Sequence, residues 1–345
     1  MNEAAPKKMW LNAIIFAVIL GVTAYVVLNG LQLDTVSQNL SSINPFYLSV
    51  AILCGFLFVI FESVNIRRIL NSLGYRVNPV NGLKYGAAGF FFSSLTPSAS
   101  GGQPMQLYFM HRDKIKLSHG SMTLLIEFAC FQLVSTCLGT IGFIINKDII
   151  LSAGKYFWVL LVCGLLVNLI ILLVILMIIF FPKPASALVK GISRVLRKFR
   201  FFRRRINDDN INDFLLEYHE SADFLKKNPP LLIKLVLTGI AQILSLYSVV
   251  FFVCLALGLT DFSWISITSL QGTFSVGVSF IPLPGAMGVS EYGFSVVYGA
   301  VFSEKFIGTI LILSRAVSFY LPLVLSGVYL GLTILIDRLK NRGRM

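Results

Sequence analysis

Residues 83–110 have the sequence LKYGAAGFFFSSLTPSASGGQPMQLYFM, which is apolar at both ends and interrupted in the middle. Glycine weakens a helix and proline removes a backbone donor, so one continuous helix cannot pass through the interruption. Unpaired backbone groups are costly in lipid, and such a break persists only inside protein or beside a wet cavity. We predict a re-entrant hairpin, two half-helices that enter a membrane and turn back. The interrupting residues are Ser93, Ser94, Thr96, Pro97, Ser98, Ser100, Gly101, Gly102, Gln103 and Pro104.

A second stretch, residues 262–302, repeats this pattern around the sequence FIPLPGAMGVSEYG at 280–293. Its proline and glycine residues again interrupt a segment that is otherwise apolar. Two broken segments in corresponding halves of a chain are the best sequence indication of a transport site in a membrane protein. We therefore predict that the two breaks meet near the middle of the membrane.

The composition is that of an all-α integral membrane protein. Of 345 residues, 56% are apolar and only 13% are charged, and the mean hydropathy is +0.80. The net charge of +13 is explained by basic residues on the cytoplasmic side of a membrane rather than by nucleic-acid binding. The five cysteines fall inside apolar runs without the spacing of a metal site, so we expect them to pack in the core.

About six full spans accompany the two hairpins. A loop with Asp34 as its only charged residue follows the first span. The second span ends before Arg67 and Arg68. Each apolar run is long enough to cross the hydrocarbon region or nearly so. The predicted spans are residues 10–31, 46–61, 118–145, 157–181, 231–257 and 306–336.

The distribution of basic residues predicts the orientation. If the first hairpin returns to the side from which it entered, nearly all of the 29 Lys and Arg lie on one side of the membrane. Only Lys147, Lys155 and Lys305 then lie on the other side, while Arg315 lies within the membrane. The positive-inside rule therefore favours the re-entrant hairpin and places both termini in the cytoplasm, in a bacterial-type cell membrane.

The order of the elements predicts an inverted-topology repeat. The series of two spans, a broken hairpin and a span occurs in residues 1–156 and again in residues 157–345. The second copy starts on the opposite side of the membrane from the first, as inverted repeats of transporters do. The spacing agrees, because Pro97 precedes Glu127 by 30 residues and Pro284 precedes Arg315 by 31.

The polar segment 182–230 belongs to the second copy and carries the densest group of basic residues. Basic and apolar residues alternate in 194–205, a pattern that suits an amphipathic helix on an anionic lipid surface. The alternative is an ordinary basic cytoplasmic loop. The acidic second half is expected to form a soluble helix capped by Asn212 or Asp213. Nucleic-acid binding is not expected here.

Glu127 and Arg315 are charged residues within predicted spans. A charge at the centre of the bilayer is costly unless it is paired or hydrated, so both are candidate functional residues. We expect them to face a shared central cavity, where Arg315 attracts phosphate and Glu127 balances it or meets a cationic headgroup. The alternative is a structural ion pair between the two copies. Glu62, at the end of the second predicted span, is expected to be interfacial.

The tips of the hairpins provide further candidate substrate-binding residues. Half-helix amino termini and glycine amides suit phosphate, although the hydroxyl groups can instead satisfy their own broken backbone. Glu291 lies in the first turn of a half-helix, where it acts either as a cap or as a headgroup contact. No catalytic triad, metal motif or cofactor motif is apparent. The candidates at the tips are Thr96, Ser98, Gly101, Gly102, Gln103, Pro284, Gly285, Gly288 and Glu291.

Three features together resemble a known family. They are TPSASGGQP at 96–104, Glu127 in the following span, and PLPGAMGVSEYGF at 282–294. They are similar to the flippase-type membrane domain of the lysylphosphatidylglycerol synthase/flippase, or multiple peptide resistance factor, family. The resemblance implies transfer of aminoacylated phosphatidylglycerol between leaflets, which lowers the negative surface charge and repels cationic peptides. Full-length members also carry a soluble aminoacyltransferase domain, which is not expected within the 345 residues of this chain.

Lipid flipping through a polar midplane cavity is therefore the leading functional hypothesis, without a catalytic residue or a cofactor. The expected partners are membrane phospholipid, the anionic lipid surface and a second copy of the chain. One alternative is an ion-coupled transporter of a small solute. Another is the membrane part of an aminoacyl-phosphatidylglycerol synthase (phosphatidylglycerol lysyltransferase) system.

Overall fold

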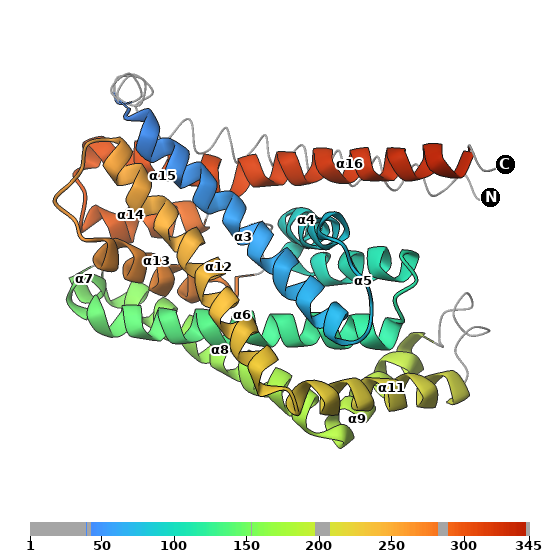
Figure 1. Cartoon of the computed structure of the whole chain (residues 1–345). Coiled ribbons are helices and arrows are strands. Elements are labelled where there is room, and N and C mark those ends of the chain that lie inside the picture. Colours follow the sequence, from blue (N-terminus) through green and yellow to red (C-terminus); the bar gives the residue numbers. More distant parts are fainter. Residues whose placement is uncertain (1–38, 40–42, 153, 197–207, 282–288, 343–345) are drawn as a thin grey trace.

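The computed structural model describes residue 39 and residues 43–152, 154–196, 208–281 and 289–342 (Figure 1). This described part consists of helices and loops without a strand, which confirms the predicted all-α fold. Its long apolar helices confirm a multi-pass membrane protein. The five that are long and apolar enough to cross a membrane are α3 (Pro45–Ser72), α6 (Leu117–Ile145), Phe157–Phe180 of α8 (Lys155–Phe180), α12 (Pro229–Ala256) and the combined segment Glu304–Ile336.

These five helices agree with five of the six predicted spans, and the first predicted span, 10–31, lies outside the described residues. The bounds differ most for α3, which was expected to end at residue 61 and continues to Ser72. Its last two turns hold Arg67 and Arg68, whose guanidinium groups bond to protein. Arg67 Nε donates to the carbonyl of Val77 at 2.9 Å, and Arg68 donates to Thr238 Oγ1 at 2.7 Å. The basic residues therefore do not end the helix.

Helices α3 and α12 pack side by side along their length and cross the molecule diagonally (Figure 1). At one end the Asn44 amide donates to the carbonyl of Ala256 at 2.8 Å, and towards the other end the Asn65 side chain donates to the carbonyl of Leu235 at 3.2 Å. The two helices are therefore antiparallel. Each begins with a proline in its first turn after an asparagine cap, Asn44 for α3 and Asn228 for α12.

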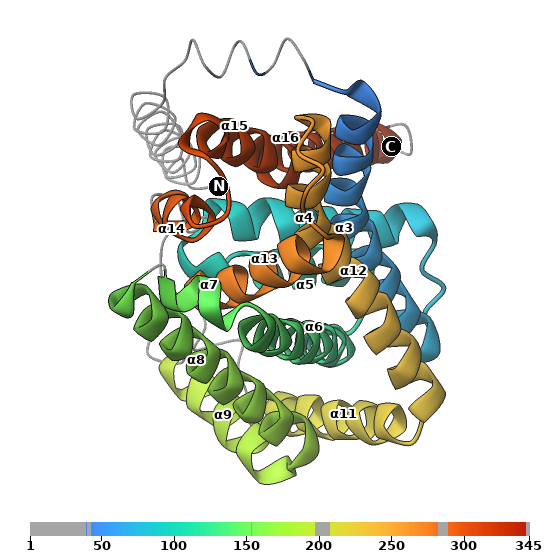
Figure 2. The same cartoon turned by 90° about the vertical axis from the view of Figure 1, so that its left-hand side faces the viewer.

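The first broken segment has its break where the sequence predicts it. Helix α4 (Pro79–Leu95) is followed by a short 3-10 turn (Pro97–Ala99) and then by α5 (Gly102–Arg112). Pro104 does not interrupt a helix, because it lies in the first turn of α5, where its missing N–H has no intrahelical partner. Helix α4 lies across the long helices, since it is seen end-on in Figure 1 and lengthwise in Figure 2.

This segment begins and ends at the same end of the molecule, as expected of a re-entrant segment. Tyr75, which follows α3, forms a 2.8 Å hydrogen bond with Nδ1 of His119 in the first turns of α6. The Tyr75 hydroxyl also accepts from the amide of Lys116 at 3.2 Å. The chain between these contacts therefore enters the bundle and returns, and it does not cross to the far end.

The second broken segment comprises α13 (Trp264–Val278) and α14 (Val289–Gly299), and residues 282–288 between them lie outside the described part. It too begins and ends at one end of the molecule, because the rings of Phe262 and Phe302 are 4.9 Å apart. This is the opposite end from the first segment, since Ser269 near the start of α13 bonds to Asn146 at the carboxyl end of α6. Short helix α7 (Lys147–Ser152) joins α6 to α8 there.

The last span is not one regular helix. Helix α15 (Glu304–Arg315) continues through a π-helical turn (Ala316–Tyr320) into α16 (Leu321–Arg342). Pro322 explains the irregularity, because it has no N–H to donate four residues back and its ring crowds the preceding turn. Turns of this kind occur often at functional sites. Here the turn directly follows Arg315.

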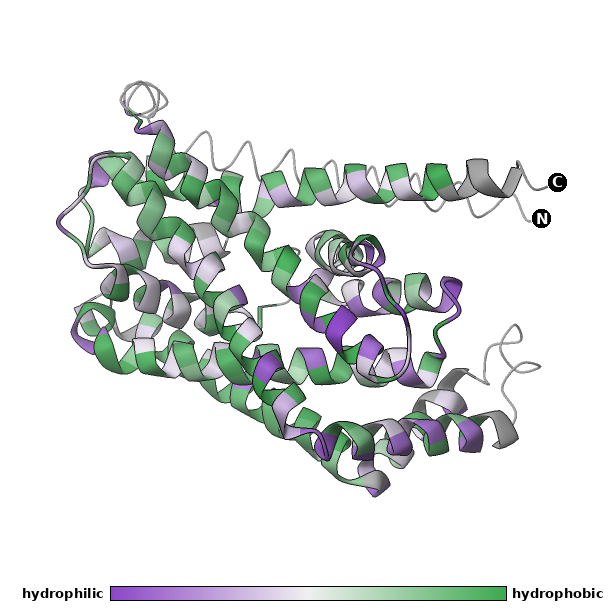
Figure 3. Cartoon of the chain, in the orientation of Figure 1, coloured by the Kyte–Doolittle hydropathy of each residue, from purple (hydrophilic) through white to green (hydrophobic). Residues whose placement is uncertain are grey.

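Polar residues gather at the end where α3 and α5 finish, whereas apolar residues cover the long helices (Figure 3). Two helices of the polar segment lie at this end, α9 (Pro182–Leu196) and α11 (Asp208–Lys226). Helix α11 is held against the start of α6, where Glu217 accepts from Lys116 Nζ at 2.6 Å and from Ser118 Oγ at 2.5 Å. The prediction that this helix begins at Asn212 or Asp213 is wrong, because it begins earlier.

The cysteines correspond only partly to the expected packing residues. All five are free thiols, and Cys54, Cys130 and Cys254 are buried. Cys137 and Cys163 are instead exposed on α6 and α8. These two positions lie on the apolar outer surface, so an apolar sequence context alone does not show whether a residue faces the core or the lipid.

Candidate functional site

A cavity of about 760 Å³ lies at the centre of the helices, and both broken segments contribute to its wall. The tip of the first segment contributes Ser98 and Ser100. The described residues at the end of α13 contribute Ser279 and Ile281. Segments that enter from opposite ends therefore line one chamber. We call this space the central cavity.

Glu127 lies on α6 and faces the central cavity. Its side chain is buried, with 9% of the residue exposed. Among the described residues it has no hydrogen-bond donor and no cation as a partner. The carboxyl group of Glu62 is close enough to interact with it electrostatically. Buried polar groups in folded proteins are nearly always hydrogen-bonded, so a carboxyl group in this position indicates a site for water or a ligand.

Glu62 lies beside Glu127, and the expectation that it is interfacial is wrong. Because α3 continues to Ser72, Glu62 lies inside this helix and lines the central cavity. Its carboxylate accepts from Gln106 Nε2 of α5 at 2.7 Å. Gly89 makes room for this pair, since a Cβ at residue 89 would lie 2.2 Å from Gln106 Nε2 and 2.8 Å from Glu62 Oε1. The close approach of α3, α4 and α5 thus builds an acidic region in the cavity.

Arg315 also lines the central cavity and is the last residue before the π-helical turn. Its guanidinium group donates to Oγ of Ser290 in α14, and its Cζ atom lies 5.8 Å from the centre of the Phe319 ring. Ser290 immediately follows the break of the second segment. The guanidinium group is thereby held next to the amino-terminal end of α14, where an anion is favoured by the helix dipole.

The expectation that Glu127 and Arg315 share a cavity agrees with this geometry, but the alternative of a structural ion pair does not. Glu127 pairs with no described cation, and Arg315 is held by Ser290. The cavity therefore has an acidic region, Glu62 and Glu127, and a basic region, Arg315. The two regions do not neutralise each other, so both are candidate partners of a ligand.

Three tip residues serve the backbone rather than the cavity, and their predicted role in phosphate binding needs correction. Thr96 Oγ1 donates to the carbonyl of Phe92 at 2.7 Å and accepts from the amide of Gly101 at 2.8 Å. The Gly101 N–H is thus already used. Gly102 allows close packing, because a Cβ there would lie 2.0 Å from Ser93 Oγ and 2.8 Å from the carbonyl oxygen of Gly89. None of these three residues lines the cavity.

Ser98 and Gln103 do line the central cavity, as the sequence predicts. Ser98 has a φ of 52° and Ala99 a φ of 54°, so two consecutive non-glycine residues are left-handed. This conformation costs roughly 1–2 kcal/mol per residue, and it is found mainly where the surrounding structure imposes it for function. The tip of the first segment is therefore held in a strained, polar conformation against the cavity.

The candidates on the second tip lie largely outside the described residues. This applies to Pro284, Gly285 and Gly288, which belong to the segment 282–288. Glu291 lies in the first turn of α14 as expected, but its side chain is outside the described part. Its neighbour Ser290 is described, and it is the residue that bonds to Arg315.

Polar residues inside the apolar spans form part of the site, and the sequence analysis missed them. Gln132 of α6 donates to Asn168 Oδ1 of α8 at 2.6 Å, and Asn168 Nδ2 donates to Ser279 Oγ at 2.8 Å. Oε1 of Gln242 in α12 is buried without a partner among the described residues. An uncharged amide in a long apolar run was the signal that could have identified these residues.

Comparison with known proteins places the chain in a family. Residues 9–326 match the family described as "Lysylphosphatidylglycerol synthase TM region". The chain is also similar to a "UPF0104 membrane protein" of Archaeoglobus fulgidus, with 23% identity over 282 residues, covering 80% of this chain and 83% of that protein. This relative's description gives no substrate. The match to the family extends over most of the chain, including both broken segments, and the chain therefore belongs to the family of lysylphosphatidylglycerol synthase transmembrane regions.

Proposed function

We propose that this protein is a flippase that moves a phospholipid between the two leaflets of a membrane. The headgroup crosses through the central cavity while the acyl chains remain in the surrounding lipid. The observation that carries this proposal is the cavity itself, about 760 Å³ in volume, lined by both broken segments and containing Glu127 and Arg315. A buried charge is costly in a membrane and is retained where a polar substrate must pass.

The two charged regions favour a headgroup that carries both signs. Arg315, held by Ser290, suits a phosphate group, because a guanidinium group matches the geometry of phosphate oxygens. Glu127 and Glu62 suit an ammonium group, and Gln103 supplies a further polar contact from the first tip. Aminoacylated phosphatidylglycerol has one phosphate and at least one ammonium group, and membership of the lysylphosphatidylglycerol synthase family supports this choice.

The opposite entry sides of the two broken segments support an inverted repeat, with residues 1–156 and 157–345 as the two copies. Such a repeat allows the cavity to open to one leaflet at a time. The polar end that contains Arg67, Arg112 and Lys116 is the cytoplasmic end in this proposal, and a cell membrane is the site of action. Exposed Lys183 and Lys190 of α9 lie in the same basic segment as 194–205, which we propose contacts anionic lipid.

A proteoliposome assay tests the function. Lysylphosphatidylglycerol is added to the outer leaflet, and its amines are then titrated with trinitrobenzenesulfonate, a reagent that does not cross the bilayer. The wild-type protein is expected to reduce the outer-leaflet fraction within minutes towards an even distribution. An identical fraction with and without protein contradicts the proposal. Uptake of free radiolabelled lysine without lipid movement identifies the protein instead as a transporter of a soluble solute.

A further inference from the structure

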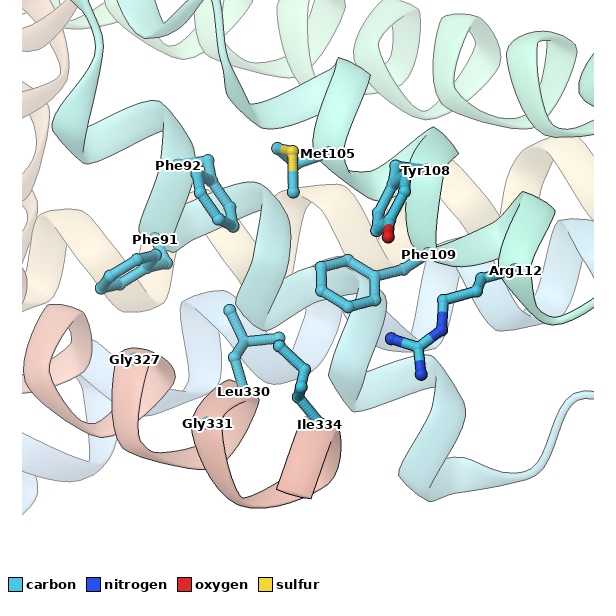
Figure 4. A pocket seen from close by; sticks show the side chains of 10 residues that line it. All are labelled: Phe91, Phe92, Met105, Tyr108, Phe109, Arg112, Gly327, Leu330, Gly331 and Ile334. Carbon is cyan, nitrogen blue, oxygen red and sulfur yellow. The ribbon is translucent and has the colours of Figure 1, made fainter. Parts of the chain in front are cut away.

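A second hollow lies on the other side of the first broken segment, between this segment and α16. It has a volume of about 480 Å³, and we call it the α5–α16 groove (Figure 4). Its walls are aromatic and apolar, with Phe91 and Phe92 from α4, Met105 and Phe109 from α5, and Leu330 from α16. The guanidinium group of Arg112 lies at one end of the groove, beyond Phe109 (Figure 4).

The groove exists because α16 touches α4 tightly at one turn and leaves it at the next. A Cβ at Gly327 would lie 2.6 Å from the ring of Phe91, so the helices are in contact there. One turn further, nothing lies within 4 Å of a Cβ at Gly331. The hydroxyl of Tyr329 donates to the carbonyl of Val80 at 2.9 Å, which holds α16 beside the start of α4. The space at Gly331 is therefore a fixed feature of the packing.

The groove is separate from the central cavity. Residues Gly89, Phe90 and Ser93 of α4 line the central cavity, whereas Phe91 and Phe92 line the groove. The same division applies to α5, where Gln103 and Gln106 line the cavity and Tyr108 lines the groove. The first broken segment is thus a wall with a polar surface on one side and an aromatic surface on the other.

We propose that the α5–α16 groove binds one anionic phospholipid of the polar-end leaflet, with its phosphate at Arg112 and an acyl chain along Phe91, Phe92 and Leu330. Charge complementarity selects this occupant, because the guanidinium group of Arg112 has several N–H donors and can bind a lipid phosphate in addition to the interaction that it already makes within the protein. The apolar walls suit a hydrocarbon chain. Arg112 is the last residue of α5, and this helix ends at the polar end of the molecule (Figures 1 and 3), where lipid phosphates are found. This binding site does not depend on whether the bound lipid is later transported across the membrane.

Photolabelling of the full chain tests the site. The protein is reconstituted in phosphatidylcholine vesicles with a trace of phosphatidylglycerol whose acyl chain carries a diazirine, and labelled peptides are identified by mass spectrometry. Label is expected on residues 91–109 and 327–334. Arg112→Gln is expected to lower this label about fivefold, the effect of one basic residue at a lipid surface. The same probe built on phosphatidylcholine is expected to label the groove weakly.

Gly331→Leu is the blocking variant, because its side chain fills the open space and should abolish the label. Gly191→Leu is the matched control, since Gly191 on α9 also has nothing within 4 Å. Thermal unfolding of both variants identifies any loss of folding. Unchanged labelling in Gly331→Leu overturns the proposal, and so does equal labelling by the two lipids. An Ile334→Cys variant tests whether protein fills the groove instead. A cross-link from the new thiol to a cysteine placed in residues 10–31, or to one in a second copy of the chain, would also overturn the proposal.

Discussion

The two sides of the first broken segment differ in chemistry although they belong to the same 34 residues, Pro79–Arg112. One side lines the central cavity and carries polar groups such as Gln106, which bonds to Glu62. The other side lines the α5–α16 groove and is aromatic. A phospholipid has the same division between headgroup and acyl chains. In the proposed mechanism, the segment separates a path for headgroups from a surface for hydrocarbon.

Loss of charge in the central cavity should have the largest effect on transport. We expect Glu127→Gln and Arg315→Ala each to lower the rate of lipid flipping at least about tenfold, the effect of one lost contact to a charged group. Glu127→Gln should not lower the midpoint of thermal unfolding, because it removes a buried charge that has no partner among the described residues. Flipping assays and thermal unfolding measure the two effects.

Glu220→Gln is the matched control, since Glu220 is an exposed residue of α11 away from the cavity. It should keep the wild-type rate. Equal rates in Glu127→Gln and Glu220→Gln would mean that the acidic region plays no part in transport. The polar side of the segment would then have only a structural role.

Close packing within the segment predicts the next largest effect. Gly102→Val places a side chain against Ser93 and the backbone of Gly89, so α5 must move away from α4. Overpacking of this kind costs about 1–3 kcal/mol, and thermal unfolding should show the loss. Gly331→Ala is the contrasting change on the groove side, because its methyl group meets open space and alanine favours a helix. Equal stability of the two variants would contradict the packing described here.

The hydrogen bond between Gln106 and Glu62 provides a finer test of the polar side. Gln106→Leu leaves the Glu62 carboxylate without this donor and should destabilise the protein by about 1–3 kcal/mol. Tyr108→Leu, a change to the same residue type on the groove side of α5, should cost less, because Tyr108 is 54% exposed. Chemical unfolding of both variants measures the difference. A larger loss in Tyr108→Leu would contradict the assignment of the two sides.

The smallest effect concerns pH and lies outside the spans. The hydrogen bond from Lys116 Nζ, followed by the one from Ser118, lowers the pKa of Glu217 below its ordinary value of 4.5. Because the pKa of Glu217 is lower in the folded protein than in the unfolded chain, its ionised carboxylate stabilises the docking of α11 on α6 above pH 4.5. This stabilisation is lost as the pH falls below 4.5 and the carboxylate becomes protonated. Hydrogen exchange of α11 should therefore rise at low pH. Glu217→Gln should reduce this dependence on pH. A variant in which hydrogen exchange of α11 depends on pH as in the wild type would contradict the prediction.

The sequence predicted the elements that depend on local chemistry. Proline and glycine locate both breaks, and the length of the apolar runs locates the five described spans to within a few residues, except at the end of α3. That exception explains the error at Glu62. Arg67 and Arg68 were interpreted as the membrane boundary, but their bonds to Val77 and Thr238 allow the helix to continue. Thr238 is far from Arg68 in sequence, and the bond to Val77 depends on how the chain turns after the helix, so no local pattern reveals either bond.

The candidate site was predicted less completely for a similar reason. Charge within a span identified Glu127 and Arg315, because charge is rare there. Uncharged residues such as Gln132 and Asn168 give a weaker signal, and their roles depend on which helices become neighbours. The role of Gly101 also could not be read from composition, because its amide is used by Thr96 in the three-dimensional turn. Tertiary contacts, rather than residue types, decide these cases.

The central claim is that a phospholipid headgroup passes through the cavity that contains Glu127 and Arg315. The most direct measurement uses lysylphosphatidylglycerol whose lysyl side chain carries a diazirine on carbon and keeps both ammonium groups, light activation in proteoliposomes, and mass spectrometry of the labelled peptides. We expect label on cavity residues such as Gln103, Gln106 and Ser279, and its loss when Glu127→Gln and Arg315→Ala are combined. Label confined to lipid-exposed residues such as Leu173 and Val328, with none in the cavity, would contradict the account.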